Sequence, residues 1–189
     1  MSESLITKQA ISNGLKQVMK EKTFDKVRIS DITKACGLNR QTFYYHFQDK
    51  YELLHWIFCN EVIVVLTKDL SLDTWSDNLY HLFCILKEQK SFYKNAIKHS
   101  FHDEFHDYLF QISTEMFYTI IEQMDEYKQI SESDKLFLAK FFANGEVGSI
   151  ISWINDEIPK SPEEMKDIIV SLVNACKAYA AKRYMAEHS

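Results

Sequence analysis

Glycine and proline are scarce in this sequence, with 4 and 2 occurrences among 189 residues. Proteins use about 7% glycine and about 5% proline on average. Sheet proteins place these residues at their many turns, and dinucleotide-binding folds need glycine-rich loops, so the scarcity argues against both. It favours long helices joined by short connections. The composition, 46% hydrophobic and 26% charged, is typical of a globular protein.

Other features are missing as well. The first ten residues hold no apolar segment of a secretory signal, and the longest apolar run, Val62 to Leu66, is too short to span a bilayer. The four cysteines have no CxxC spacing, which predicts reduced thiols in a cytoplasmic protein without membrane contact. The absence of HExxH, GxSxG, P-loop and GxGxxG motifs predicts a protein that is not an enzyme and needs no cofactor.

Charge is divided unevenly along the chain. Residues 1–50 carry nine Lys and Arg against five Asp and Glu, a balance of +4, whereas residues 51–189 carry thirteen against twenty-two, a balance of −9. A basic segment on an acidic body is typical of a nucleic-acid-binding protein, although clustering of solvated lysines would look the same.

Capping signals in the basic segment predict two short helices joined by a tight turn. Ser30 is expected to cap a helix over residues 31–36, which Gly37 ends, and Asn39 is expected to cap a second helix over residues 40–47. Asp49 then begins a longer helix, with Glu52 placed for a capping box. Two short helices around a glycine turn are the sequence form of a helix-turn-helix.

The second short helix has two unlike faces. Phe43 and Phe47, four residues apart, should face the core. Polar and aromatic residues occupy the rest: Arg40, Gln41, Thr42, Tyr44, Tyr45 and His46. Arg and Gln suit guanine and adenine edges in a DNA major groove, and the hydroxyls and imidazole suit phosphates. Packing against neighbouring helices is the alternative for Tyr44 and Tyr45, and we expect at least one of them to expose only its hydroxyl.

Residues Val27 to Leu54 resemble the DNA-binding domain of TetR/AcrR-family transcription regulators. The matching motifs are Asp31-Ile32-Thr33, Gly37, the run Thr42 to Phe47, and Lys50-Tyr51-Glu52-Leu53. The resemblance implies an all-α homodimer, with DNA-binding helices at residues 1–50, an effector-binding and dimerisation domain at 51–189, and about nine helices in all. The implied DNA contacts are Ser30 (at most through its backbone), Asn39, Arg40, Gln41, Thr42, Tyr44, Tyr45 and His46, with Lys50 on a phosphate.

A narrower similarity extends over residues 38–58 and 141–165 to regulators of dihydroxyacetone kinase operons. The resemblance leaves the effector open, as a small molecule or a protein, and does not choose between repression and activation.

The acidic part predicts further helices over residues 74–88, 91–98, 102–127, 134–155 and 162–186. The helix over 134–155 is apolar on most sides and contains Gly145 and Gly148, which we expect to allow close helix approach. The family resemblance favours a dimer interface on the last two helices, with an ordinary core helix as the alternative. The expected interface residues are Phe141, Gly145, Gly148, Ile151, Ile169, Leu172 and Cys176.

Three histidines, His99, His102 and His106, recur at helical spacing with acidic residues between them. They could hold a metal ion, and a zinc-sensing regulator of the same fold is one alternative. A solvated polar face is the preferred interpretation, so no metal site is predicted. A helical interaction module that binds no DNA is the second alternative.

Overall fold

The computed structural model describes residues 3–124 and 131–187, with side chains left undescribed at 100–105 and 177–187. The described residues form helices and contain no strand, which confirms the predicted all-α class. Contacts divide the chain into a first unit, Met1–Val64 with Gln89–His102, and a second unit, Val65–Glu88 with Asp103–Ser189. The predicted boundary after residue 50 separates a DNA-binding domain from an effector-binding and dimerisation domain, and it stays a prediction.

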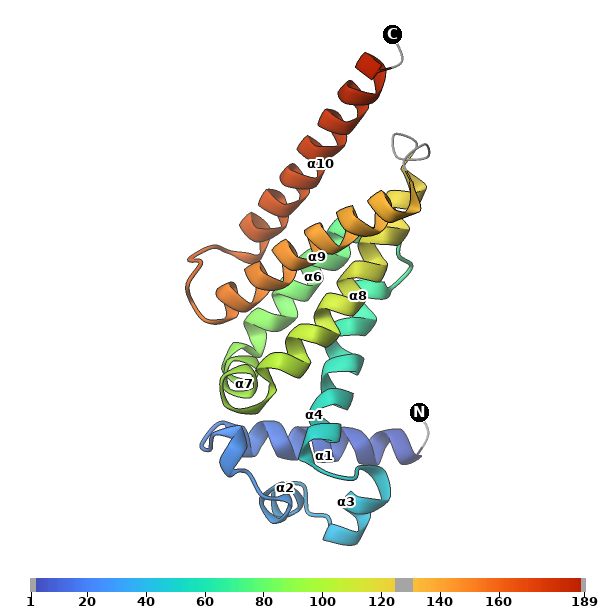
Figure 1. Ribbon diagram of the computed structural model, residues 1–189. Helices are drawn as coiled ribbons and strands as arrows, with labels where there is room; N and C mark the ends of the chain where they lie inside the picture. Colours follow the sequence, from blue (N-terminus) through green and yellow to red (C-terminus); the bar gives the residue numbers. More distant parts are fainter. Residues whose placement is uncertain (1–2, 125–130, 188–189) are drawn as a thin grey trace. The chain divides into compact units, whose positions relative to one another are not determined.

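The first unit contains α1 (Glu3–Met19), the 3₁₀ turn η1 (Phe24–Lys26), α2 (Ile29–Ala35), α3 (Arg40–His46) and α4 (Lys50–Phe58) (Figure 1). The π-helical turn η2 (Cys59–Ile63) follows α4, and the unit also holds α7 (Lys90–Ala96) and the π-helical turn η3 (Ile97–Phe101). Its core is built from buried side chains of every helix, among them Ile11, Leu15, Ile32, Phe43 and Ile57.

The two glycines of the first unit serve different needs. Gly37 has a φ of 70° and ends α2, where the Leu38 amide donates to the Thr33 carbonyl at 3.0 Å. Gly14 lies where α1 meets α2, since a Cβ there would stand 2.9 Å from the Ile32 carbonyl oxygen. Both glycines fix how the helix-turn-helix is folded and supported.

The second unit contains α5 (Val64–Thr67), α6 (Trp75–Glu88), α8 (His102–Gln123), α9 (Glu132–Ile154) and α10 (Pro162–Glu187). Figure 1 shows α9 running along α6 and α8. Phe83 and Trp153 join α6 to α9 edge to face, with 5.2 Å between ring centroids, and Met165 and Val173 bury the inner face of α10. Ser161 and Glu164 form a capping box at the start of α10: the Ser161 hydroxyl accepts the Glu164 amide at 3.2 Å, and the Glu164 carboxylate accepts the Ser161 amide at 2.7 Å.

One expectation about local structure is wrong. Arg28, not Ser30, is the residue before α2, and its amide donates to Asp31 Oδ2 at 3.0 Å, so Ser30 lies inside the first turn. In α9, Gly145 and Gly148 have no atom within 4 Å of a Cβ added to either, so no helix of the described chain approaches them closely. The close approach expected there stays a prediction about a second copy of the chain. Within the described chain, no helix is long and apolar enough to span a membrane.

Candidate DNA-binding surface

The start of α3 is fixed by Asn39. Its Oδ1 accepts the Thr42 amide at 2.8 Å and the Thr42 hydroxyl at 3.1 Å. Phe43 and Phe47 are buried on the inner face of α3, with 5.9 Å between their ring centroids. The predicted cap and the predicted pair of anchors are both confirmed. Together they fix which side of this seven-residue helix faces outward.

The outer face of α3 carries the side chains expected to meet DNA. Arg40 and Gln41 are exposed at the first turn, and His46 is half-buried at the last. Tyr44 is 57% exposed and Tyr45 is 84% exposed, so the expectation that one of them shows only its hydroxyl is wrong. The reason is that α3 is short and packs inward through the buried Phe43. The Phe43 ring meets the Tyr44 ring edge to face, with 5.6 Å between ring centroids.

Three predicted contact residues also have local roles. The Thr42 hydroxyl and the Asn39 side chain bond each other, which leaves less hydrogen-bonding capacity for DNA. Ser30 is half-buried in α2, and its carbonyl accepts the Thr33 hydroxyl at 3.4 Å. These residues position the helix-turn-helix as well as lining its surface.

Lys50 has a structural role in addition to the phosphate contact predicted for it. Its ammonium donates to the carbonyls of Phe24, Asp25 and Val27 at 2.8, 2.9 and 3.0 Å, and it lies 4.8 Å from the centre of the Phe24 ring. An ammonium group has three donors, and all three are used here. Burial lowers the pKa of Lys50, with Asp25 opposing that shift. These bonds tie α4 to the segment before α2, and the phosphate contact of Lys50 stays a prediction.

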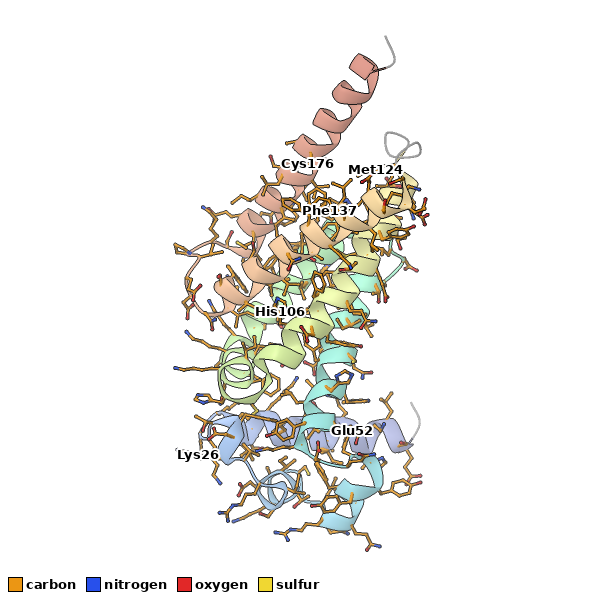
Figure 2. All side chains as sticks on the ribbon, in the orientation of Figure 1. Lys26, Glu52, His106, Met124, Phe137 and Cys176 are labelled. Carbon is orange, nitrogen blue, oxygen red and sulfur yellow. The ribbon has the colours of Figure 1, made fainter. Side chains whose placement is uncertain are left out.

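Asp49 supports the same region. Its Oδ1 accepts the amides of Tyr51 and Glu52 at 2.8 and 2.9 Å, and Glu52 Oε2 accepts the Gln48 amide at 2.5 Å. This confirms Asp49 as the cap of α4, which follows α3 after three residues. Glu52 bonds the amide of Gln48 and not that of Asp49, so the predicted capping box is not formed in full. Figure 2 labels Glu52 within the first unit.

Two polar side chains of α7, which the sequence did not indicate, hold the first unit together. Asn95 accepts the Phe24 amide at 3.0 Å and donates to the carbonyls of Met19 and Lys22 at 3.1 and 2.8 Å. Tyr93 is buried and donates to Glu61 at 3.3 Å. The same carboxylate is 2.5 Å from Lys16 of α1, and burial raises the pKa of Tyr93. These partners lie 32 to 76 residues apart along the chain, and no local sequence signal marks them.

The histidines give no metal site in the described residues, where no group of three metal-binding side chains occurs. His99 lies 3.9 Å from Asp25, and His106 stacks on Phe110 with 6.2 Å between ring centroids. The side chain of His102 is outside the described residues, so the predicted constellation stays untested. No observation favours the zinc-sensing alternative.

The predicted dimer residues lie on the outer faces of α9 and α10. Phe141 and Leu172 are 62% and 60% exposed, Gly145, Gly148 and Cys176 are exposed, and Ile151 and Ile169 are half-buried. Phe137, labelled with Cys176 in Figure 2, extends this face. We call the exposed residues Phe137, Phe141, Ile168 and Leu172 the outer apolar face.

A short, capped helix presenting polar side chains after a glycine turn defines a helix-turn-helix protein. Comparison with known families agrees: residues 12–57 match the model described as bacterial regulatory proteins of the tetR family, and residues 73–175 match a transcriptional regulator C-terminal region of the same group. The chain belongs to the TetR family of transcription regulators, which identifies it as a regulator and not as an enzyme.

One curated relative is the HTH-type dhaKLM operon transcriptional activator DhaS of Lactococcus lactis subsp. lactis (strain IL1403). It is 33% identical over 94 residues, which make up 50% of each sequence, so the chain spans about half the length of that relative. A solved structure of a dihydroxyacetone kinase operon activator DhaS has a TM-score of 0.76 at 26% identity, covering 93% of this chain and 98% of that one.

A TetR regulator from Streptococcus agalactiae 2603V has a TM-score of 0.63 at 19% identity, over 90% of this chain and 95% of its own. That likeness shows the fold alone. The first two comparisons support the narrower similarity seen in the sequence.

Proposed function

We propose that this regulator binds an inverted-repeat DNA operator as a homodimer, and that a ligand or partner protein acting on residues 51–189 controls the binding. Residues 1–50 hold the DNA-reading helices in this proposal, and the protein works in the cytoplasm, where bacterial DNA lies. The observation that carries it is the outward placement of Arg40, Gln41, Tyr44 and Tyr45 on a helix anchored by Phe43 and Phe47.

The chemistry of that surface suits a major groove. Arg40 supplies a bidentate donor for guanine, Gln41 can pair with adenine, and the two tyrosine hydroxyls and His46 can reach phosphates. The α3 helix has no acidic residue in its first turn, so nothing there repels the DNA backbone. Arg40 therefore reads sequence, while the tyrosines set the position of the helix.

Selection of bound duplexes from a random pool tests this proposal directly. We expect an inverted repeat, with half-sites about one helical turn apart or slightly more. Arg40→Ala should cost about 1–3 kcal/mol and relax the preference at one base pair. Lys140→Ala is a matched control, because Lys140 is exposed on α9 of the second unit. Absence of binding to any duplex at low salt would favour the interaction module instead.

The homodimer is supported by the outer apolar face. Water-exposed phenylalanine and leucine side chains on adjacent helices mark a surface that another chain covers. Phe141→Lys with Leu172→Lys should halve the mass measured by sedimentation and remove binding to the full repeat. Ile6→Lys is the matched control, because Ile6 is as exposed as these residues but lies on α1. An unchanged dimer in the double variant would contradict this assignment.

The relatives named as dihydroxyacetone kinase operon activators suggest a gene target. Locating the selected repeat in the genome tests whether it precedes a dihydroxyacetone kinase operon. A reporter with the repeat upstream then shows whether the protein activates or represses.

A further inference from the structure

Residues of α8 and of the first turns of α9 line an open groove in the second unit. Its volume is about 600 Å³, and its lining residues are Thr114, Glu115, Tyr118, Thr119, Glu132 and Leu136. Leu136 is 41% exposed and, with the Tyr118 ring, gives the groove an apolar part. Ligand sites in proteins have volumes of about 300–1,000 Å³, so this groove is large enough for an occupant.

The side chains that line the groove have already used their own hydrogen-bond donors. The Tyr118 hydroxyl donates to Glu132, and this bond raises the pKa of Tyr118 to about 12, so the phenol keeps its proton at neutral pH. The hydroxyls of Thr114 and Thr119 donate to carbonyls one turn earlier in α8, at 2.7 and 2.9 Å. The side-chain oxygens that remain available accept hydrogen bonds, so the groove suits an occupant that brings donors.

The groove is also anionic. The α8 helix carries five Asp and Glu and no Lys or Arg over its 22 residues. Glu132 is paired with Lys135 at 2.7 Å, whereas Glu115 and Glu122 are exposed and form no ion pair within the described residues. These two glutamates are seven residues apart, which is two helical turns or about 10 Å along α8, so they lie on the same face. Glu115 and Glu122 are therefore the carboxylates that remain for cations.

Arginine matches both requirements, because a guanidinium group is a cation with five donors and no acceptor. A single small cation cannot reach two carboxylates that are about 10 Å apart, whereas one helix can carry two arginines at that spacing. An amphipathic helix lying in a groove is a common form of protein recognition.

We propose that this groove binds a basic helix of a partner protein, whose arginines, two turns apart, pair with Glu115 and Glu122. An apolar side chain between these arginines packs on Leu136, and a guanidinium group lies over the Tyr118 ring. This inference rests on the proposed control through residues 51–189 and assigns that control to a partner protein.

Selection of helical peptides from a random library against the full chain tests the docking surface. A variant with Glu115→Gln and Glu122→Gln serves for counter-selection. We expect the enriched peptides to carry Arg or Lys two helical turns apart, with an apolar residue between them. Enrichment of peptides without basic residues would overturn the proposal.

The affinity of an enriched peptide, measured by calorimetry, separates charge from shape. Replacing its arginines with citrulline, which keeps their shape and removes their charge, should weaken binding about tenfold, as should the glutamine double variant. Glu88→Gln with Glu157→Gln is the matched control, because both are exposed glutamates of the second unit outside the groove and the net charge changes equally. Leu136→Ala should weaken binding of the arginine and citrulline peptides alike.

Four results would overturn the partner helix. Two of them are equal affinity for the citrulline peptide and unchanged affinity in the glutamine double variant. Binding of argininamide as tightly as the peptide would assign the groove to a small cation, and a lower mass of the glutamine double variant in sedimentation would assign it to a second copy of the chain. These measurements use no DNA, so their failure leaves the DNA-binding proposal intact, and failure to select an operator leaves the docking surface intact.

Discussion

The two units of this regulator differ in the kind of aromatic ring they expose and in whether their charged side chains have partners among the described residues. On α3 the exposed rings belong to Tyr44 and Tyr45, whose hydroxyls suit water and phosphate, whereas on α9 they belong to Phe137 and Phe141, which carry no polar group. In the first unit the lysines at positions 16 and 50 have close partners, whereas in the second Glu146 has none among the described residues. The first unit therefore pairs these charges within its own fold, whereas the second leaves apolar rings exposed and one buried carboxylate without a partner among the described residues.

Phe43→Ala should have the largest effect on this comparison. Removing a fully buried ring from α3 leaves a cavity and costs about 3–5 kcal/mol of unfolding free energy. Because the recognition helix loses its anchor, DNA binding should be lost with stability. Chemical denaturation followed by circular dichroism measures the change. Tyr45→Ala, which removes an exposed ring, is the control and should leave stability nearly unchanged.

Glu146→Gln should change how the free energy of unfolding depends on pH. The pKa of Glu146 is raised in the folded protein, so the unfolded chain releases its proton first as pH rises. The free energy of unfolding therefore falls from about pH 4.5 until Glu146 also ionises in the folded state near pH 7. Above pH 7 the free energy of unfolding is lower by about 3 kcal/mol. The glutamine variant should be more stable than the parent at pH 8 and similar to it at pH 4.5. Denaturation at both pH values checks this, and a pH-independent difference would contradict it.

Lys50→Met separates the structural role of that residue from its predicted phosphate contact. The variant leaves three carbonyls without their donor and should cost about 2 kcal/mol of unfolding free energy. Affinity for random duplex DNA, measured over a range of salt concentrations, tests the phosphate contact. A slope lowered by about one would support that contact, and an unchanged slope would leave Lys50 with the structural role alone.

Gly37→Ala should have the smallest effect of the four. The added methyl meets no neighbouring atom, but the residue must keep a φ of 70°, which costs about 1–2 kcal/mol for an L residue. Asparagine tolerates this backbone conformation better, so Gly37→Asn should cost less than Gly37→Ala. Thermal melting of both variants measures the order, and equal costs would contradict it.

Local signals predicted much of the first unit. The caps at Asn39 and Asp49 were predictable because each acts on amides two or three residues away. The roles of Phe43 and Phe47 followed from helical spacing. The failures were at Ser30, where a helix start shifted by two residues, and at Tyr44 and Tyr45, whose burial depended on neighbours that no local pattern identifies.

The sequence alone determined the helical class, the helix-turn-helix and the family, because periodicity, caps and a conformationally demanding glycine act over a few residues. Only the tertiary structure decided that the Lys50 ammonium is bonded within the protein and that Asn95 ties α7 to a segment more than seventy residues away. It also decided that Glu146 is buried with no hydrogen-bond partner among the described residues. The reason is physical: hydrogen-bond satisfaction and burial depend on which distant helices pack together, and a side chain's own neighbours in the sequence do not record that.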